Sequence, residues 1–510
     1  MLMALQLGEI IDEPIQIRRK RIMKVAIIGA GSLTFARCIV SDILRVPELA
    51  DTEVAFTDIN KRNLDMATRL IKRDIKANKL SAKVTSTLDR REALKGADYV
   101  VNMTRIGGLD GFKTDIDIPL KYGVDQCVGD TLCIGGIMYG QRNIAAILDF
   151  CKDIREVASP DVLFLNYANP NAMNTWAANL YGEVPTIGLC HGVHGGHGQI
   201  KNVIELLVNG KKKPESKTYK KIALKDVDII CAGINHQTWY IQVLYNGEDW
   251  TDRLLAGFEA HPYYSKSEKV RIDMLRRFGY YSTESNGHLS EYLPWYRKSA
   301  KEIRQWILLD EWINGETGGY LRHCSESRDW FKTEFPKMLK DEPWSYSPEH
   351  RSSEHGSYII ESLETGRIYR GHFNVINSGC ITNLPDDAIV EVPGYVDRNG
   401  INIPQVGDLP LGCAAVCNAS ITVQRLAVEA AVYGDVDLLK QAAMMDPLTG
   451  AVCTTAEISQ MVDEMLVAQA KWLPQYAAAI PAAQKRLRSE KALGTKKITG
   501  AARRKTKAKK

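Results

Sequence analysis

The sequence predicts an α/β protein in which a doubly wound parallel sheet is followed by a mixed α+β domain. Three observations predict this fold. Short apolar runs recur through the first 190 residues, and each ends at a glycine or a polar residue. Segments with apolar residues at helical spacing separate these runs. The alternation stops near residue 200, where longer helical stretches begin. Alternating strands and helices are typical of a parallel sheet with helices on both faces.

The first predicted strand, 24–29, is a continuous apolar run that stops at glycine, as expected for a strand buried on both faces. Apolar residues at helical spacing follow from Phe35 to Leu44 and, after the second strand, from Leu64 to Leu70. The predicted strands of this part are 24–29, 54–57, 98–104, 162–167 and 186–189. Loops that follow parallel strands meet at one edge of a sheet, so the residues in these loops should share one crevice.

The rest of the chain is predicted to form a second, mixed domain. Its strands are expected at 228–232 and 389–396, and its long helices around 268–278 and 420–445. We therefore divide the chain into four parts: an N-terminal extension 1–22, a doubly wound domain 23–200, an α+β domain 201–483 and a basic tail 484–510.

Composition excludes several classes of protein. A chain of 510 residues with 45% hydrophobic and 25% charged residues is ordinary for a globular protein. Its net charge of +5 is misleading, because the last 26 residues carry twelve basic residues and one acidic residue. Since this tail lacks aromatic residues, we expect a solvated extension, and nucleic-acid binding is not expected. Eleven scattered cysteines, no signal peptide and no apolar run of membrane-spanning length predict a cytoplasmic protein without membrane contact.

The loop after the first strand carries the first two glycines of a dinucleotide-binding fingerprint. Gly29 and Gly31 allow a tight turn and close approach to a pyrophosphate at the following helix, which begins after Ser32. Thr34 replaces the third glycine, so the loop alone is also compatible with a turn that binds nothing. Asp58 ends the second strand, where a carboxylate accepts from the ribose hydroxyls and repels a 2′-phosphate. Together these residues predict a Rossmann-type domain that binds NAD+ rather than NADP+.

A thiol and an imidazole follow two further strands. Cys190 comes directly after the strand 186–189, and His236 comes shortly after the strand 228–232. A thiolate and an imidazole are suitable ligands for a soft or borderline divalent metal ion. The pattern therefore predicts a metal site with positions left for substrate oxygens.

Several blocks, in this order, resemble one known family. They are TDIN (57–60), GDTLCIGGI (129–137), NYANPNAMNTW (166–176), GLCHG (188–192), CAGINH (231–236) and GYYSTESNGHLSEYLPW (279–295). The chain resembles the NAD- and metal-dependent glycoside hydrolases of family 4, particularly their α-galactosidase branch, from Met23 to Tyr476. The resemblance implies a lactate/malate dehydrogenase-like architecture, NAD+ and Mn2+ as cofactors, a small-molecule glycoside as substrate, and a homodimer or homotetramer.

The resemblance also implies roles for individual residues. Cys190 and His236 would bind the metal, and Tyr292 would be the catalytic base. Asp130 and His191 would assist catalysis, and Asn169 would contact both cofactor and sugar. The remaining implied substrate contacts are Asn171, Arg142 and His191. The implied reaction is NAD-dependent oxidation at carbon 3 of the sugar, metal-assisted elimination, addition of water and re-reduction.

The residues after Cys190 bear on the sugar. His191 is associated in this family with unphosphorylated sugars. Gly192 stands where a serine is usual in α-galactosidases, so α-glucuronidase, α-galacturonidase and α-glucosidase remain alternatives. From another class of enzyme, an NAD-dependent 2-hydroxyacid dehydrogenase also fits the dinucleotide fold.

Overall fold

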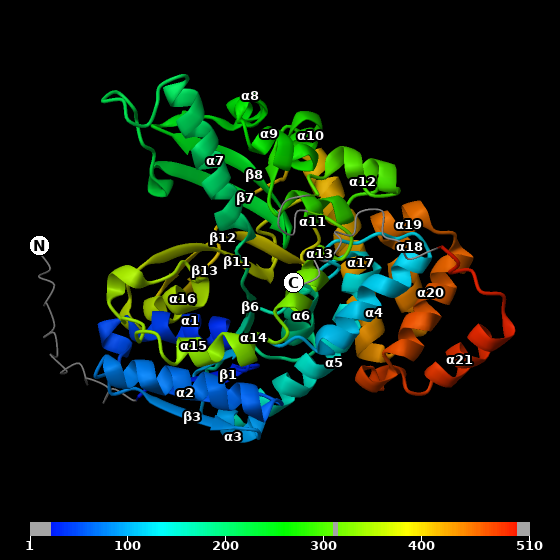
Figure 1. Cartoon of the computed structure of the whole chain (residues 1–510), viewed down its shortest axis with the longest axis horizontal. Coiled ribbons are helices and arrows are strands. Elements are labelled where there is room, and N and C mark those ends of the chain that lie inside the picture. The colour runs from blue at the N-terminus through cyan, green and yellow to red at the C-terminus, as the bar shows by residue number, and fades with distance from the viewer. Residues whose placement is uncertain (1–21, 310–314, 497–510) are drawn as a thin grey trace, which may run out of the picture.

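The structure is a computed structural model that describes residues 22–309 and 315–496 (Figure 1). In these residues the strands form one mixed sheet of thirteen strands, with β10-β8-β7-β12-β11-β6-β5-β4-β1-β2-β3 along its main path. One half of the sheet is parallel and the other is antiparallel. The two halves meet between β6 and β11, so the sheet runs through both predicted domains.

The parallel half has the strand order of a dinucleotide-binding sheet, 3-2-1-4-5-6. Its strands are β1 (Lys24–Ile28), β2 (Glu53–Thr57), β3 (Lys83–Thr87), β4 (Tyr99–Asn102), β5 (Leu163–Asn166) and β6 (Thr186–Gly188). The helices of this half are α1 (Leu33–Leu44), α2 (Lys61–Ala77), α3 (Arg90–Leu94), α4 (Gly108–Lys121), α5 (Cys133–Val157) and α6 (Asn171–Leu180). Apolar side chains of α1 and α2 pack on one face of the sheet, and those of α3, α5 and α6 pack on the other. The predicted fold class is confirmed.

The antiparallel half continues the sheet beyond β6. Its strands are β7 (Val227–Ile234), β8 (Gln237–Tyr245), β9 (Glu248–Asp249), β10 (Tyr281–Ser282), β11 (Tyr369–Ile376), β12 (Ile389–Asp397) and β13 (Gly400–Asn402). The β11–β12 pair is joined to the neighbouring strand on each side by a single residue pair. Asn374 of β11 pairs with Gly188 of β6, and Glu391 of β12 pairs with Gly233 of β7. These single pairs lie close to the residues that follow β6 and β7.

The helices between β6 and the C-terminal helices flank both halves of the sheet. They are α7 (Gly192–Asn209), α8 (Leu254–Ala260), α9 (Tyr264–Ser267), α10 (Lys269–Phe278), α11 (Asn286–Glu291), α12 (Ala300–Trp306), α13 (Gly319–Glu326), α14 (Trp330–Thr333), α15 (Phe335–Met338) and α16 (His355–Thr365). Helices α7 to α10 form a lobe at the top of Figure 1, and α14 and α15 lie beside α1 and α2. The predicted domain boundary at residue 200 falls inside α7.

The C-terminal helices pack together at one end of the molecule (Figure 1). They are α17 (Leu411–Tyr433), α18 (Val436–Met445), α19 (Pro447–Val452), α20 (Thr455–Ala468) and α21 (Ile480–Ser489). Helix α17 is long and apolar enough to span a membrane, but it packs in the core against α5, α6 and α18. Helix α17 is therefore part of the core.

The C-terminal boundary differs from the division made on the sequence. The predicted end of the second domain at residue 483 falls inside α21, where Arg486 binds the buried Asp463 through two contacts of 2.6 and 2.8 Å. Lys496 donates to the carbonyl of Tyr122 at 2.7 Å. Residues 484–496 are thus part of the folded chain. The remaining tail, 497–510, and the predicted extension up to residue 21 lie outside the described residues.

Candidate active site

A cavity of about 530 Å³ lies at the edge of the sheet where β5, β6 and β7 end. Its walls include Phe35, Val128, Asp130, Tyr167, Asn169, Leu189, Cys190, His191, Gly192, Gly195, Gly196, Gln199, His236, Glu268, Arg271, Glu284, Ser285, His288 and Tyr320. Five of the residues predicted from the sequence are among them: Asp130, Asn169, Cys190, His191 and His236. The fold therefore brings loops from both predicted domains to one place.

Three side chains in this cavity form a set of metal donors. A thiol sulfur of Cys190, a ring nitrogen of His236 and a carboxylate oxygen of Glu284 all lie within 4.8 Å of one another. Sulfur, nitrogen and oxygen donors together suit a borderline divalent ion. Glu284 lies after β10, far along the chain from Cys190, and the sequence analysis missed it. The donor set fits the predicted divalent ion.

The backbone and the neighbours of His236 fix its ring. Nδ1 lies 2.9 Å from Oγ1 of Thr131 and 3.2 Å from the hydroxyl of Tyr292, while Nε2 lies 3.4 Å from Glu284. Contacts of this kind at the second ring nitrogen orient metal-binding histidines. Both His236, at φ +66°, and Glu284, at φ +77°, adopt the left-handed conformation, which is uncommon for residues other than glycine. Such backbone conformations concentrate at functional sites.

The three metal donors differ in their protonation when no metal ion is bound. Burial raises the pKa of Cys190 well above its usual range, and Glu391 and Glu284 raise it further. Burial also lowers the pKa of His236. Glu284 is buried too, but His236 and His288 outweigh burial and hold its pKa below the usual range. Without a cation nearby, the thiol therefore keeps its proton, whereas His236 and Glu284 are already in the forms that bind metal ions.

His288 connects the donor set to Asp130. Its Nδ1 lies 3.5 Å from Glu284, and its Nε2 lies 3.5 Å from Asp130. Burial alone would lower the pKa of His288, but the contacts with Asp130 and Glu284 outweigh burial and raise it to about 10. Burial alone would raise the pKa of Asp130, but His288 and Arg105 hold it below its usual range. At neutral pH the site thus contains an imidazolium between two carboxylates. The sequence analysis missed His288.

Two further groups hold the carboxylate of Asp130. A guanidinium nitrogen of Arg105 and the side-chain amide of Asn169 each lie 3.3 Å from the same oxygen, Oδ2. The Asn169 carbonyl accepts from Asn143 at 2.5 Å. Asn169 therefore lies beside Asp130 in the cavity, at the end of β5.

Glu291 of α11 holds the loop that carries Asp130. The carboxylate of Glu291 accepts from the backbone N–H groups of Cys127 and Val128 at 2.5 Å and of Gly129 at 2.9 Å. Glu291 is fully buried. It precedes Tyr292 in the chain, so one short helix fixes the position of both this loop and the contact to His236. Sequence reasoning named Tyr292 but not Glu291.

Tyr292 and His191 occupy different surroundings. Tyr292 is buried behind His236 and does not line the cavity, and burial together with Glu291 raises its pKa well above the usual range. His191 lines the cavity, and its Nε2 lies 2.5 Å from Glu354. This hydrogen bond raises the pKa of His191. Of the three predicted catalytic residues, Asp130 and His191 therefore line the cavity and Tyr292 does not.

Two predicted substrate contacts do not reach the cavity. Arg142 is fully buried, and its guanidinium forms two contacts of 2.8 and 2.6 Å with the carboxylate of Asp115. The amide nitrogen of Asn171 donates to the carbonyls of Asn166 and Leu189. Both side chains connect elements inside the core. Neither Arg142 nor Asn171 lines the cavity, so the structure does not bring these two predicted residues together with the others.

The predicted dinucleotide loop connects β1 to α1. Gly29 has φ +87°, a conformation that favours glycine, and a side chain at Gly31 would meet the carboxylate of Asp58 at 2.6 Å. This carboxylate accepts from the N–H groups of Gly31 at 2.8 Å and Asn60 at 2.7 Å. Ser32 gives α1 no side-chain cap, so the first N–H groups of α1 are available for a pyrophosphate.

A second cavity, of about 370 Å³, lies over this loop. Its walls include Gly31, Ser32, Leu33, Thr34, Asn63, Met66, Ser327, Arg328, Trp330 and Phe331. Ile59, next to Asp58, is fully exposed although it is apolar. An exposed apolar side chain beside a loop with free N–H groups fits the base and phosphates of a dinucleotide. The contribution of residues 327–331 could not be expected from the local sequence.

Comparisons with known proteins support the same interpretation. The sequence profile of "Family 4 glycosyl hydrolase" matches residues 24–206, and that of "Family 4 glycosyl hydrolase C-terminal domain" matches residues 231–449. The chain belongs to glycosyl hydrolase family 4. The family membership predicted from the sequence blocks is confirmed.

Two relatives within family 4 are named α-galactosidases. That of Rhizobium meliloti (strain 1021) is 58% identical over 94% of this chain and 95% of the relative. That of Bacillus subtilis (strain 168) is 34% identical over 89% of this chain and 99% of the relative. A 6-phospho-β-glucosidase from Thermotoga maritima, solved with manganese, NAD+ and glucose-6-phosphate, has the same fold, with a TM-score of 0.70 at 22% identity over 88% of this chain and 99% of that one.

Proposed function

We propose that this family 4 enzyme is an α-galactosidase that uses NAD+ and a divalent metal, with Mn2+ the first candidate, to cleave unphosphorylated α-galactosides. The observation that carries the proposal is the meeting of a Cys–His–Glu donor set with Asn169, Asp130 and His288 in one cavity. The 58% identity to a relative named α-galactosidase supports the choice of sugar.

Different residues would bind the metal, the dinucleotide and the sugar. When bound, NAD+ supplies a hydride acceptor and the metal supplies Lewis acidity for the sugar oxygens. Cys190, His236 and Glu284 would hold the metal, and Gly31, Ser32 and Asp58 would hold the dinucleotide. Asn169, beside Asp130 in the cavity, would contact a sugar hydroxyl and the cofactor.

Proton transfer falls to the pair of His288 and Asp130. His288 carries its proton at neutral pH, because its pKa is about 10, and donates it from Nε2 to the departing glycosidic oxygen. Asp130 stays ionised, orients this ring and compensates its charge. His191, paired with Glu354, lines the same cavity and would orient the sugar. Tyr292 remains the candidate base by the family resemblance, acting beside His236.

The charges around the cavity favour a neutral sugar over a uronide. Among the described wall residues, Arg271 is the only arginine or lysine, and its guanidinium is paired with Glu268 at 3.1 Å. Arg105, close by, is paired with Asp130, and Arg297 is paired with Asp125. A uronate carboxylate would therefore find no unpaired arginine or lysine on these walls.

A substrate panel tests the proposal. We expect p-nitrophenyl α-galactoside, assayed with NAD+, Mn2+ and a thiol, to be hydrolysed faster than the α-glucoside, α-glucuronide and α-galacturonide. Preference for a uronide or a glucoside would replace the proposed sugar and keep the reaction. Steady accumulation of NADH with a 2-hydroxyacid, without glycoside cleavage, would instead support the dehydrogenase alternative.

The proposal also covers the cellular location and the oligomeric state. We propose a cytoplasmic enzyme, because eleven cysteines are present and those in the described residues are free thiols. We also propose a homodimer or homotetramer, which light scattering of the purified protein tests directly.

A further inference from the structure

One short segment, 317–331, borders both cavities described above. Tyr320, at the start of α13, lines the active-site cavity. Trp330 and Phe331, at the start of α14, line the second cavity, over the dinucleotide loop. The same stretch of chain therefore contacts the sites proposed for the sugar and for the cofactor.

The beginning of this segment is hydrogen-bonded to the loop that carries Asp130. The N–H group of Gly318 donates to the carbonyl of Gln126 at 2.8 Å. The N–H group of Tyr320 donates to the carbonyl of Cys127 at 3.1 Å. Both acceptors lie a few residues before Asp130, in the loop that also binds the carboxylate of the buried helix α11. A shift of α13 would therefore shift the loop.

The side chain of Tyr320 is connected to Asp130 through Arg105. The guanidinium carbon of Arg105 lies 5.5 Å from the centroid of the Tyr320 ring and 4.4 Å from that of Phe112, within the range of cation–π contacts. The same guanidinium lies 3.3 Å from Oδ2 of Asp130. Nη1 of Arg105 is buried without a hydrogen-bond partner among the described residues. Aromatic rings, rather than a second acceptor, thus hold this side of Arg105.

The other end of the segment rests on the helices beside the dinucleotide loop. Trp330 and Phe331 pack against an apolar cluster that includes Leu33 of α1 and both Met66 and Leu70 of α2. Leu33 is the first residue of α1, whose N-terminal N–H groups are the proposed pyrophosphate site. A ligand in the second cavity would therefore contact α1 and the start of α14 together.

Little apolar burial holds the segment between these two ends. In α13 only Gly319 is buried, and α14 contains no buried residue. Elements with few buried contacts have low local stability. A ligand that contacts Trp330 and Phe331 favours the arrangement in which these residues line its cavity, and so stabilises the contacts of α13 with the Asp130 loop.

We propose that Tyr320 is a positioning residue through which an occupied cofactor cavity fixes Arg105 and Asp130, so that the dinucleotide raises the affinity for the sugar. The effect passes along residues 317–331 and does not require the nicotinamide ring to touch the sugar. By linkage, the sugar raises the affinity for the dinucleotide by the same factor. The inference rests on the proposed α-galactosidase function and adds a coupling between its two sites.

ADP-ribose is the probe that tests this coupling. It has the adenosine and the pyrophosphate of NAD+ but lacks the nicotinamide that accepts the hydride and would meet the sugar directly. Isothermal titration calorimetry of the full-length enzyme with Mn2+ measures the Kd of galactose with and without saturating ADP-ribose. The quantity compared is the ratio of these two Kd values. No turnover occurs, since no hydride acceptor is present.

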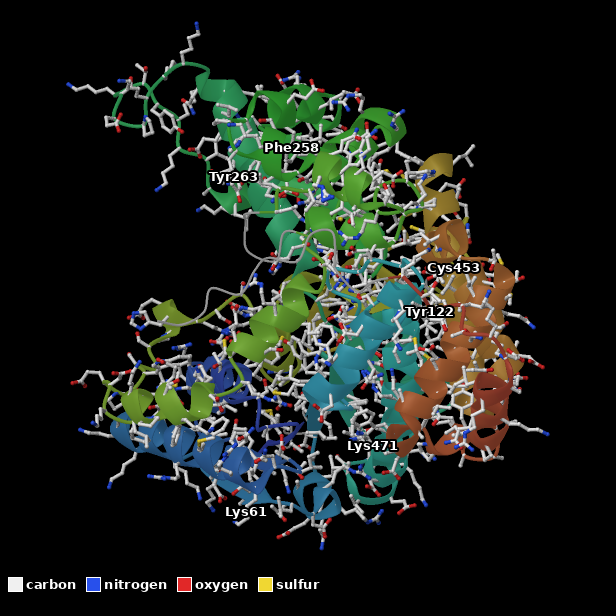
Figure 2. The ribbon with its side chains drawn as sticks, turned by 45° about the vertical axis from the view of Figure 1, so that its right-hand side comes forward. Lys61, Tyr122, Phe258, Tyr263, Cys453 and Lys471 are labelled. Atoms are coloured by element: carbon white, nitrogen blue, oxygen red, sulfur yellow. The ribbon has the colours of Figure 1, made fainter. Side chains whose placement is uncertain are left out.

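Two variants at one position separate the ring of Tyr320 from its hydroxyl. Tyr320→Phe keeps the ring beside Arg105, whereas Tyr320→Ala removes it. Tyr263→Ala, in the upper lobe labelled in Figure 2, removes a tyrosine ring that lines neither cavity and is the control. Because the ratio is taken within each variant, a uniform weakening of sugar binding by the lost ring cancels.

We expect ADP-ribose to lower the Kd of galactose about fivefold or more in the wild type, in Tyr320→Phe and in Tyr263→Ala. In Tyr320→Ala the ratio should fall to nearly one. A wild-type enzyme that binds both ligands with a ratio near one, or an undiminished ratio in Tyr320→Ala, would overturn the coupling and leave the proposed function standing. Failure of the wild-type enzyme to bind either ligand alone would instead overturn the proposed function.

Discussion

Nε2 of His288 lies 3.5 Å from Oδ1 of Asp130, and the same ring lies 3.5 Å from Glu284 through Nδ1. One imidazolium thus joins a metal donor to the carboxylate beside Asn169. Charge on any one of these groups depends on the others, because Asp130 and His288 are buried and Glu284 is mostly so. The predictions below test this network and the elements that hold it.

The raised pKa of His288 predicts a pH-dependent stability. A histidine whose pKa is higher in the folded state stabilises the protein below its unfolded value of 6.5, and this stabilisation is lost as the pH rises toward about 10. The slope from this group is at most about 1.4 kcal/mol per pH unit. Urea unfolding of the metal-free protein across this range should show the loss in the wild type and a smaller slope in His288→Gln. An equal slope in His288→Gln would contradict the assignment, and His350→Gln, at an exposed histidine, serves as the control.

Removal of a contact behind the metal ligand should weaken metal binding. Thr131→Val keeps the shape of the side chain but removes the hydroxyl that lies 2.9 Å from Nδ1 of His236. We expect the Mn2+ affinity to fall about 10- to 100-fold, as for other contacts that orient metal-binding histidines. Electron paramagnetic resonance of free Mn2+ measures this, and NAD+ affinity should not change. Thr422→Val, on the exposed side of α17, is the matched control. Unchanged Mn2+ affinity in Thr131→Val would rule out the orienting role.

Glu291→Gln should loosen the loop that presents Asp130. The carboxylate accepts three backbone N–H groups, and an amide offers one acceptor oxygen where two serve now. We expect the free energy of unfolding to fall by about 1.5–3 kcal/mol, since a buried charged acceptor is lost. The value of kcat should fall more than KM rises, because the loop carries Asp130 rather than a main binding surface. The same change at the exposed Glu326 should alter neither quantity, and an undiminished kcat in Glu291→Gln would argue against the positioning role.

Two truncations distinguish the folded end of the chain from the rest of the basic segment. Ending the chain after residue 496 should leave the melting temperature unchanged. Ending it after residue 483 should lower it, because Asp463 loses Arg486 and keeps only Lys440 at 3.1 Å. The pKa of Asp463 is held below its usual range by these cations despite its burial, so the difference should shrink as the pH falls below the unfolded pKa of 3.8 and through the lower pKa of the folded state. Equal melting temperatures at neutral pH would show that α21 adds no stability.

The parallel half of the sheet was predictable because its strands are short apolar runs, buried on both faces. The strand β3 was missed because it is mostly exposed and polar at the edge of the sheet. The strands β8 and β11 were missed because an antiparallel extension of a parallel sheet depends on long-range pairing that no local period reveals. The same limit applies to the boundaries at residues 200 and 483, which fall inside helices.

The sequence by itself determined the fold class, the dinucleotide loop, and the places of Cys190 and His236, because each follows from a strand that ends at the same edge of the sheet. Only the tertiary structure decided that Glu284 and His288 complete the site. They lie on a segment that returns to this edge from the far end of the sheet. The tertiary structure also decided that Arg142 is paired with Asp115 in the core. Local periodicity fixes which face of an element is apolar, whereas the pairing of polar side chains depends on which elements meet after folding.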